Sequence, residues 1–185
     1  MIIKKTPNSP IGVFDSGLGG LTVLKSLEKI LPNESFIYLG DTAHVPYGNK
    51  SGEMVTLFSK QIMDFFIKNE TKAVVIACNT ASAVAFQHLK KIYDIPLFDV
   101  VSSSVEYSMK ITKTHKIGVV GTYSTIQSSA YKRMFKDLGD TCTIQEIPCP
   151  LFVPIIEEGW ADSAIARGIA EIYLNDFTNS DIDTL

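Results

Sequence analysis

Residues 73–83 read AVVIACNTASA, an apolar run that stops abruptly at a thiol, an amide and a hydroxyl. Five small or β-branched residues without polar alternation predict a strand buried on both faces, as in a parallel sheet. Cys78 follows this strand at its carboxyl end, where the loops of an open α/β sheet converge on a ligand-binding crevice. The stretch therefore predicts an α/β fold with Cys78 at the ligand-binding edge of the sheet.

The residues after Cys78 predict the start of a helix. Asn79 and Thr80 can each cap a helix over residues 81–92, whose first backbone N–H groups would face the thiol. These donors and the positive end of the helix dipole favour a thiolate, so we expect a lowered pKa for Cys78 and a role as base or nucleophile. The structural alternative is a buried cysteine that only packs at the end of a strand.

The composition is that of an ordinary globular protein. Of 185 residues, 45% are hydrophobic and 20% are charged, which suffices for one good core or two small ones. The net charge of −3 comes from interspersed acids and bases, which argues against nucleic-acid and membrane partners. No apolar run has the length of a membrane span, so we expect a cytoplasmic protein. The three cysteines lack the spacing of a disulfide framework or a zinc site, and neither a metal nor a cofactor is expected.

The first hundred or so residues alternate strand and helix patterns. A strand over residues 11–15 leads through the glycine loop SGLGG into a helix over residues 21–31. This loop lacks the spacing of nucleotide-binding motifs, but its backbone N–H groups can bind a small anion. Further strands are predicted at 35–41 and 96–101, and a helix begins near Ser51. The alternation predicts a mostly parallel sheet with helices on both sides.

A loop follows the second predicted strand and contains His44, Pro46, Tyr47 and Gly48. Pro46 and Gly48 predict a turn that presents Tyr47 at its edge. The alternative is that Tyr47 simply packs over the loop.

The same pattern begins again in the second half of the chain, which indicates an internal duplication. Residues 117–119 (IGV) repeat residues 11–13, and each copy leads through a polar turn into a helix, here over 125–138. The second copy of the Cys78 strand is then expected at residues 183–185.

We therefore predict two α/β lobes with mostly parallel sheets flanked by helices, residues 1–101 and an incomplete second lobe, residues 102–185. The second lobe is predicted to contain a strand over 143–147 and a helix over 161–173. Glu157 adjoins the start of a predicted helix, where a solvated acidic side chain would be unremarkable in itself.

Asp15 and Cys78 are expected to meet, because both follow strands of one parallel sheet. A carboxylate beside a thiol can accept or relay its proton, and Ser16, Asn79 and Thr80 can hold a small ligand that carries a carboxylate. This set of groups suits proton transfer at carbon. Inversion of a stereocentre needs a base on one face of the substrate and an acid on the other, which two duplicated lobes could supply.

Five motifs in this order resemble glutamate racemase, of the aspartate/glutamate racemase family, over nearly the whole chain. They are IGVFDSGLGG at 11–20, VPYG at 45–48, ACNTA at 77–81, Gly121-Thr122, and PLFVP at 150–154 followed by Glu157.

The resemblance implies a cofactor-independent amino-acid racemase of two α/β lobes that supplies D-glutamate for peptidoglycan. It implies that Cys78 is one of two catalytic cysteines, that Asp15 assists it and that Glu157 is an acid of the second lobe. The substrate-binding residues that it implies are Asp15, Ser16, Tyr47, Gly48, Asn79, Thr80 and Thr122.

The chain departs from the family pattern in one respect. Members carry a second motif, Gly-Cys-Thr-His followed by an aromatic residue and Pro, and this sequence ends just before it. Neither Cys142 nor Cys149 has that context, so we expect that these 185 residues alone bind glutamate weakly and do not racemise it.

Two alternatives stay open at this point, a cysteine hydrolase or amidotransferase with Cys78 as nucleophile and His44 as base, and a ligand-binding module without activity. Aspartate as substrate is excluded only by the particular motifs. A homodimer is compatible with the sequence, which does not fix the oligomeric state.

Overall fold

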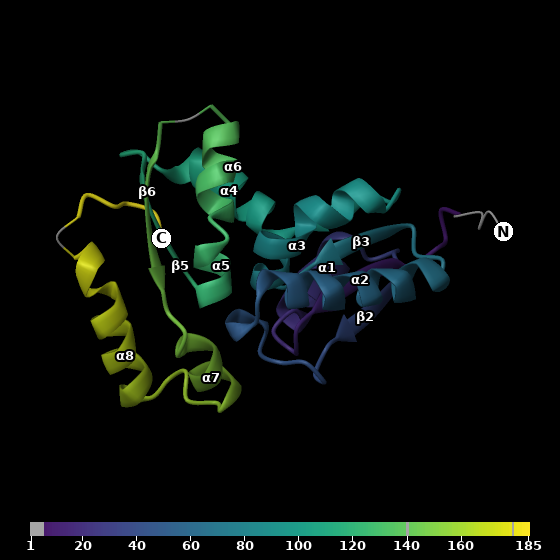
Figure 1. The fold of residues 1–185 in the computed structure, drawn as a ribbon, viewed down its shortest axis with the longest axis horizontal. Helices are drawn as coiled ribbons and strands as arrows, with labels where there is room; N and C mark the ends of the chain where they lie inside the picture. The colour runs from purple at the N-terminus through teal and green to yellow at the C-terminus, as the bar shows by residue number, and fades with distance from the viewer. Residues whose placement is uncertain (1–5, 140, 179) are drawn as a thin grey trace. The chain divides into compact units, whose positions relative to one another are not determined.

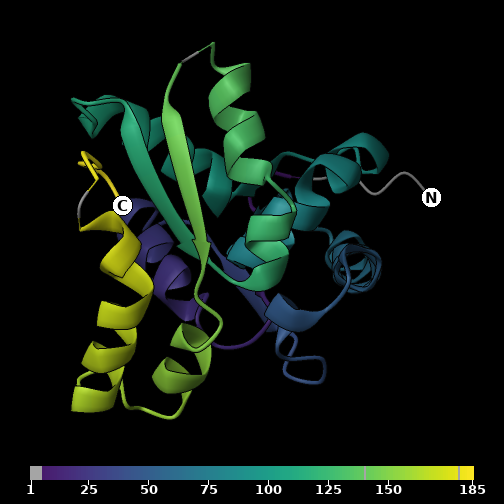
Figure 2. The ribbon, with the colours of Figure 1, turned by 60° about the vertical axis from the view of Figure 1, so that its left-hand side comes forward.

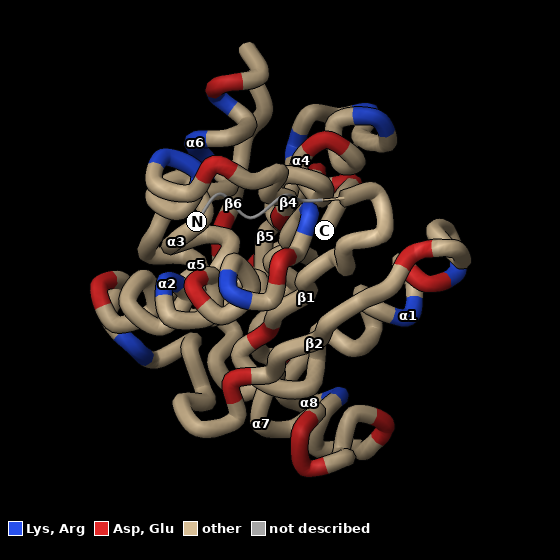
Figure 3. The backbone as a smooth tube through the Cα atoms, turned by 90° about the vertical axis from the view of Figure 1, so that its right-hand side faces the viewer, with Lys and Arg blue, Asp and Glu red and all other residues tan. Residues whose placement is uncertain are grey.

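The computed structural model describes residues 6–139, 141–178 and 180–185. The chain divides into two compact units, the first reaching Ser103 and the second beginning at Ser104, and each is described by itself (Figure 1). Acidic and basic residues are distributed along the helices and loops of both units (Figure 3). None of the helices in the described part of the chain is both long enough and apolar enough to cross a membrane.

The first unit contains a four-stranded parallel sheet in the order β2-β1-β3-β4. Its centre is β1, all of whose residues are buried, with Ile11 in register with Phe36 of β2 and with Ala73 of β3. In β3, Val74 and Ile76 are buried but the alternate residues are half-buried, so the expected burial on both faces is found in β1 rather than in β3. The strands are β1 (Ile11–Asp15), β2 (Phe36–Gly40), β3 (Ala73–Ile76) and β4 (Leu97–Asp99).

Helices cover both faces of this sheet. Figure 3 shows α1 on the opposite side of β1 and β2 from α2 and α3. Gly12 of β1 faces the ring of Phe66 in α2, and a Cβ atom added at Gly12 would lie 2.7 Å from that ring. The absence of a side chain at Gly12 therefore allows α2 to approach β1 closely. The helices are α1 (Leu21–Ile30), the short 3₁₀ helix η1 (Tyr47–Asn49), α2 (Gly52–Lys68), α3 (Asn79–Ile92) and α4 (Val100–Ile111), which continues into the second unit.

The second unit repeats the parallel arrangement on a smaller scale. Its strands β5 and β6 pair in parallel and lie between α8 on one side and α5 and α6 on the other (Figures 1 and 2). Thr184 forms a parallel bridge to Ile117 of β5, in the position that β3 takes beside β1 in the first unit. The elements are β5 (Lys116–Gly121), α5 (Tyr123–Gln127), α6 (Ala130–Asp137), β6 (Thr143–Pro148), α7 (Phe152–Glu157), α8 (Ala164–Leu174) and the 3₁₀ helix η2 (Asn175–Phe177).

Two predicted elements differ in extent from those observed. The strand expected over 96–101 ends at Asp99, because the Asp99 carboxylate accepts hydrogen bonds from the N–H groups of Val101 and Ser102 and so begins α4 there. The helix expected over 125–138 is two helices, α5 and α6, since Ser129 between them has a φ of +53° and interrupts the helical backbone.

Candidate active site

The carboxyl edge of the four-stranded sheet carries a row of four reactive groups. Asp15 and Asp99 are the last residues of β1 and β4, Asp41 directly follows β2, and Cys78 lies two residues after β3. Because all four strands run parallel, these residues follow one another along a single edge in the order Asp41, Asp15, Cys78, Asp99. The edge therefore places one thiol among three carboxyl groups.

Asp15 organises the glycine loop that follows it. Its side chain is buried, and Oδ2 accepts hydrogen bonds from the N–H groups of Gly17 and Gly20, each at 3.1 Å. The loop is also held from β2, where the Tyr38 hydroxyl donates to the carbonyl oxygen of Gly17 at 2.9 Å. Gly40 approaches this same carbonyl so closely that an added Cβ atom would lie 2.2 Å from it. The loop backbone is thus fixed at both ends of the turn.

Cys78 itself caps α3. Its Sγ accepts a hydrogen bond from the N–H of Ala81 at 3.4 Å, and its thiol donates to Oγ of Ser16, also at 3.4 Å. The prediction that Asn79 or Thr80 caps this helix is wrong, because both lie inside its first turn. Helix start and glycine loop therefore meet at the sulfur, as the strand-end pattern predicted.

The pKa of Cys78 is raised, contrary to the prediction. Burial of the thiol is the largest cause, and the negative charge of Asp15 adds to it. Hydrogen bonds with the side chain and backbone of Ser16 and with the backbone of Ala81 lower the pKa but do not outweigh burial and charge. The resting sulfur is consequently a thiol, and its conjugate thiolate is a stronger base than that of an exposed cysteine.

Tyr38 shares this environment. Burial, followed by the charges of Asp15 and Cys78, raises the pKa of Tyr38 to about 12, so its hydroxyl stays protonated and keeps its hydrogen bond to the loop. Tyr38 was not among the residues predicted from the sequence. An aromatic residue in the β2 sequence is typical of a strand and indicates no further role. The neighbouring residues do not indicate that the Tyr38 hydroxyl reaches Gly17, 21 residues earlier in the chain.

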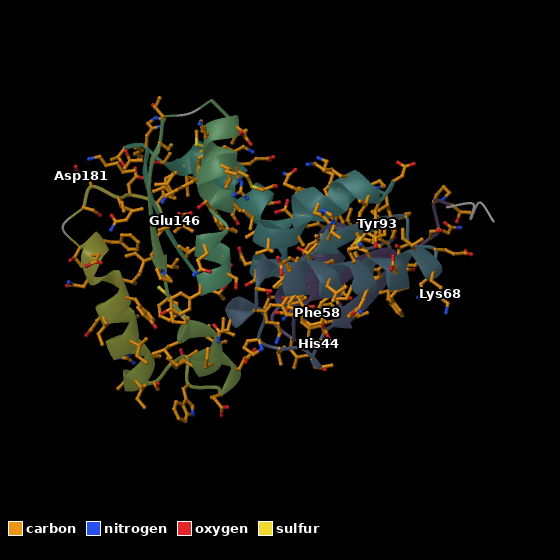
Figure 4. All side chains as sticks on the ribbon, in the orientation of Figure 1. His44, Phe58, Lys68, Tyr93, Glu146 and Asp181 are labelled. Carbon is orange, nitrogen blue, oxygen red and sulfur yellow. The ribbon has the colours of Figure 1, made fainter. Side chains whose placement is uncertain are left out.

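Tyr47 is buried rather than presented at the edge of its turn. Only 1% of its surface is exposed, and its hydroxyl donates to Oδ2 of Asp41 at 2.6 Å. The same carboxylate contacts Nδ1 of His44 at 2.8 Å, and the imidazole ring stacks on Phe58 with 4.0 Å between ring centroids (Figure 4). Burial, the largest cause, and the Asp41 hydrogen bond raise the pKa of Tyr47. Its side chain therefore fixes the loop that carries Gly48.

Ser16 contacts the sulfur, and Asn79 and Thr80 directly follow Cys78 in the chain. Asn79 and Thr80 are the first two residues of α3, the former exposed and the latter buried. Ser16 is half-buried and contacts the thiol directly.

Thr122 and Glu157 belong to the second unit. Oγ1 of Thr122 accepts a hydrogen bond from the N–H of Thr125 at 3.3 Å and caps α5. Glu157 is exposed and is the last residue of α7, so the prediction that it adjoins the start of a helix is wrong. Pro154 at the third position of α7 explains the error, since proline fits the first turn of a helix and does not exclude an earlier start.

Asp41 and Asp99 were also missed by the sequence analysis, although each follows a strand as Asp15 does. Asp41 joins Tyr47 and His44, and Asp99 caps α4 through Oδ2 while its buried Oδ1 has no hydrogen-bond partner in the described part of the chain. The strand-end pattern that selected Asp15 could have found both.

The contacts at the sulfur do not fit a thiol–imidazole pair. A cysteine hydrolase would need the imidazole of His44 within hydrogen-bond reach of Cys78. His44 instead directs Nδ1 to Asp41 and stacks on Phe58. The polar contacts of the Cys78 sulfur described here come from Ser16 and Ala81.

Comparison with known proteins gives consistent matches over nearly the whole chain. The profile of the Asp/Glu/Hydantoin racemase family matches residues 11–175. A glutamate racemase from Geobacter metallireducens is 45% identical over 179 residues, which are 97% of this chain and 66% of that protein. This chain thus spans about two thirds of the length of that curated relative.

Solved structures agree with the sequence matches. A glutamate racemase isoform from Bacillus anthracis superposes with a TM-score of 0.93 at 37% identity, covering 97% of this chain and 68% of that one. Glutamate racemase from Francisella tularensis, solved in complex with D-glutamate, gives a TM-score of 0.90 at 42% identity, covering 95% of this chain and 66% of that one.

Proposed function

Since this chain belongs to the Asp/Glu/hydantoin racemase family, we propose that it serves the interconversion of L- and D-glutamate by exchanging the Cα proton on one face of glutamate through the thiol of Cys78. The observation that carries the proposal is the joint placement of Cys78, Asp15 and Ser16 at one edge of the sheet. The raised pKa of the thiol supports this chemistry, because a weakly acidic Cα–H requires a strong base.

In the proposed step, the Cys78 thiol first loses its proton to water, and the resulting thiolate takes the Cα proton of one enantiomer, which leaves carbanion-like charge on Cα. In the reverse direction, the thiol returns a proton to the same face of Cα. The N–H of Ala81 and the hydroxyl of Ser16 stabilise the thiolate when it forms. The charge of Asp15 raises the pKa of the thiol and thereby makes the thiolate a stronger base. No cofactor is required for this proton transfer.

We propose that the substrate is held by residues bordering this edge. Ser16, Asn79, Thr80 and the buried Gly48 offer polar groups suited to carboxylates, and Asp15 can attract the substrate ammonium. Tyr47 acts through the loop that it fixes to Asp41, since its side chain is buried.

Thr122 is proposed as a further substrate contact and Glu157 as an acid, both from the second unit. D-Glutamate made in this way would supply peptidoglycan synthesis. A cytoplasmic location and a homodimer stay predictions from the sequence.

An isotope-exchange assay tests the proposal. The chain is incubated in D₂O with L-glutamate and, separately, with D-glutamate; NMR follows loss of the Cα–H signal and chiral chromatography follows formation of the other enantiomer. Because the Cys78 thiol serves only one face of the substrate, one enantiomer should exchange its Cα–H for deuterium faster than the other. Cys78→Ala should slow this exchange at least about a hundredfold, the lower end of a general base contribution.

Cys149→Ala is the matched control, because Cys149 is also a buried free thiol but belongs to the second unit. This control should exchange like the unchanged chain. Exchange that survives Cys78→Ala would overturn the assignment of the base, and glutamine hydrolysis without exchange would favour the hydrolase alternative. The same assay with aspartate measures substrate selectivity, and formation of the opposite enantiomer tests the expectation that this chain does not racemise.

A further inference from the structure

Three soft donor atoms gather in the second unit, on residues that the candidate active site does not use. Sγ of Cys142 lies 3.7 Å from Sδ of Met109 and 3.7 Å from Nδ1 of His115. Met109 belongs to the last turns of α4, His115 immediately precedes β5, and Cys142 immediately precedes β6. A thioether, an imidazole and a thiol thus converge from three separate segments.

The backbone holds His115 and Cys142 side by side. The N–H of Thr143 donates to the carbonyl oxygen of His115 at 2.8 Å, which fixes the residue next to Cys142 against the turn that carries the imidazole. The parallel pairing of β5 and β6 continues directly from this contact, with Lys116 in register with Thr143. The segments that carry His115 and Cys142 are therefore joined by backbone hydrogen bonds.

Hydrogen bonds to Asp183 fix the turn that carries His115. Its carboxylate accepts hydrogen bonds from the hydroxyl of Thr112 at 2.7 Å and from the N–H of Thr114 at 2.8 Å, and the Thr112 hydroxyl accepts one from the N–H of His115 at 3.1 Å. His115 has a φ of +54°, a conformation rare for a residue with a side chain, and these bonds maintain it. The imidazole is therefore presented by a preorganised turn.

The two separations measured from Cys142 are compatible with a trigonal metal site. With metal–sulfur bonds of about 2.3 Å and a metal–nitrogen bond of about 2.0 Å, a 120° angle places sulfur and nitrogen about 3.7 Å apart and two sulfurs about 4.0 Å apart. The observed separations of 3.7 Å match the first value and differ from the second by a few tenths of an ångström.

The donor types select the metal. Thiolate and thioether sulfur together favour Cu(I), whereas Ca²⁺ and Mg²⁺ need oxygen ligands. Within the described residues, no group of three His, Cys, Asp or Glu side chains is placed to hold a metal, so Zn²⁺ lacks its usual set of ligands here. We propose that Met109, His115 and Cys142 bind one Cu(I) ion with two sulfur ligands and one nitrogen ligand.

Binding at this site exchanges the thiol proton of Cys142 for the metal, so one proton is released for each Cu(I) bound from the protonated state. The metal would join α4 to the segments before β5 and β6. Because a ligand that binds only the folded state stabilises it, Cu(I) should raise the unfolding temperature reported by the second unit.

A competition titration tests the site. The full 185-residue chain is titrated anaerobically with Cu(I) against a coloured Cu(I) chelator, and the expected stoichiometry is one ion per chain. Cys142→Ser should lower the affinity by roughly a hundredfold, and Met109→Leu and His115→Asn by roughly tenfold each. Leucine conserves the volume of methionine, and asparagine tolerates the positive φ of His115, so both variants should keep the fold.

Two controls separate this site from other sulfur groups of the chain. Cys149→Ser removes a thiol that lies elsewhere in the second unit, and Met54→Leu removes an exposed thioether of the first unit; both should bind Cu(I) like the unchanged chain. X-ray absorption should show two sulfurs and one nitrogen around the metal. Unchanged affinity in Met109→Leu and His115→Asn, or loss of binding only in Cys78→Ser, would overturn the proposal.

Discussion

The two units begin with the same strand-turn-helix pattern but use its turn differently. In the first unit, Asp15 ends β1, and its carboxylate accepts the N–H groups of Gly17 and Gly20. In the second unit, Thr122 follows β5, and its hydroxyl accepts the N–H of Thr125 as the cap of α5. The turn after β1 thus carries a charged carboxylate at a buried edge. The turn after β5 carries an uncharged hydroxyl, which caps the following helix.

This difference extends to the titratable groups of the two units. At the edge of the first unit, burial raises the pKa values of Tyr38, Tyr47 and Cys78. At the surface of the second, hydrogen bonds from the 112–114 turn lower the pKa of Asp183, and contact with Lys116 lowers that of Asp181. The raised pKa values thus belong to buried groups of the first unit, whereas the lowered ones belong to exposed carboxylates of the second unit that hydrogen bonds or an ion pair hold in the charged form.

Two glycine-to-alanine substitutions, one at the buried edge of the first unit and one in a helix of the second, should show the largest difference between the units. An alanine Cβ at position 40 would lie 2.2 Å from the Gly17 carbonyl oxygen, a backbone atom that cannot turn aside, whereas one at position 168 in α8 meets no atom within 4 Å. Gly40→Ala should therefore destabilise the chain by about 1–3 kcal/mol, as overpacking does. Gly168→Ala should stabilise it by about 0.5–1 kcal/mol, because alanine favours a helix.

Urea unfolding followed by circular dichroism measures both changes, and the D₂O exchange assay adds a functional measure. Gly40→Ala should also slow exchange, because it displaces the loop that Asp15 organises. If Gly40→Ala unfolded like the unchanged chain, the close approach of β2 to the glycine loop would not constrain the edge. A loss in Gly168→Ala as large as that in Gly40→Ala would remove the contrast between the units.

Much of the first unit could be predicted because its signals are local. An apolar run, a glycine turn and a helical stripe follow one another in the sequence, and the parallel order of strands places their carboxyl ends together. The meeting of Cys78 with Ser16 follows from that topology. The bridge from Thr184 to Ile117 likewise lies where the repeat of the pattern predicts it.

The rest could not be predicted because it depends on burial, on side-chain partners and on backbone torsions that the sequence pattern does not show. The pKa of Cys78 reflects a balance of burial, charge and hydrogen bonds, and the sequence shows only the hydrogen-bond donors of the helix start. The burial of Tyr47 depends on Asp41, which accepts its hydroxyl six residues away. The break between α5 and α6 lies at Ser128 and Ser129. Nothing in the residue types there indicates that Ser129 has a positive φ.

Asp15→Asn should give a smaller but more specific effect, on the pKa of Cys78. Asparagine keeps the shape and an acceptor for the glycine loop but removes the negative charge that raises this pKa. The pKa of Cys78 should therefore fall. The rate of alkylation of Cys78 as a function of pH, quantified by mass spectrometry of the peptide that contains it, measures the change.

Asp99→Asn is the matched control on the same edge. Asparagine caps helices well, so α4 should keep its start, and the charge of Asp99 is not among the causes of the Cys78 shift. The alkylation profile should then stay that of the unchanged chain. Equal shifts in both variants would mean that the edge acts through its total charge rather than through Asp15.

The smallest expected effect is a difference in pH sensitivity between the units. A group whose pKa is higher in the folded state stabilises the fold below its unfolded value, and this contribution is lost as the pH rises through the folded value. Tyr38, raised from 10.0 to about 12, should make the first unit lose stability over that alkaline range. The difference in tyrosine absorbance between the unchanged chain and Tyr38→Phe, followed during unfolding at increasing pH, isolates Tyr38 of the first unit and measures this loss, and Tyr38→Phe should itself lose less stability.

The second unit should instead lose stability in acid. Asp183 has a pKa below its ordinary value of 3.8, so its contribution is complete above that value and disappears as the pH falls through the lowered one. Trp160, the only tryptophan of the sequence, lies in the second unit, and its fluorescence reports unfolding there. Asp183→Asn should weaken the acid dependence, whereas Asp162→Asn, at another exposed acid, should not. If Trp160 followed the same pH profile as the tyrosines of the first unit, the two units would unfold as one and their electrostatic difference would not be expressed in stability.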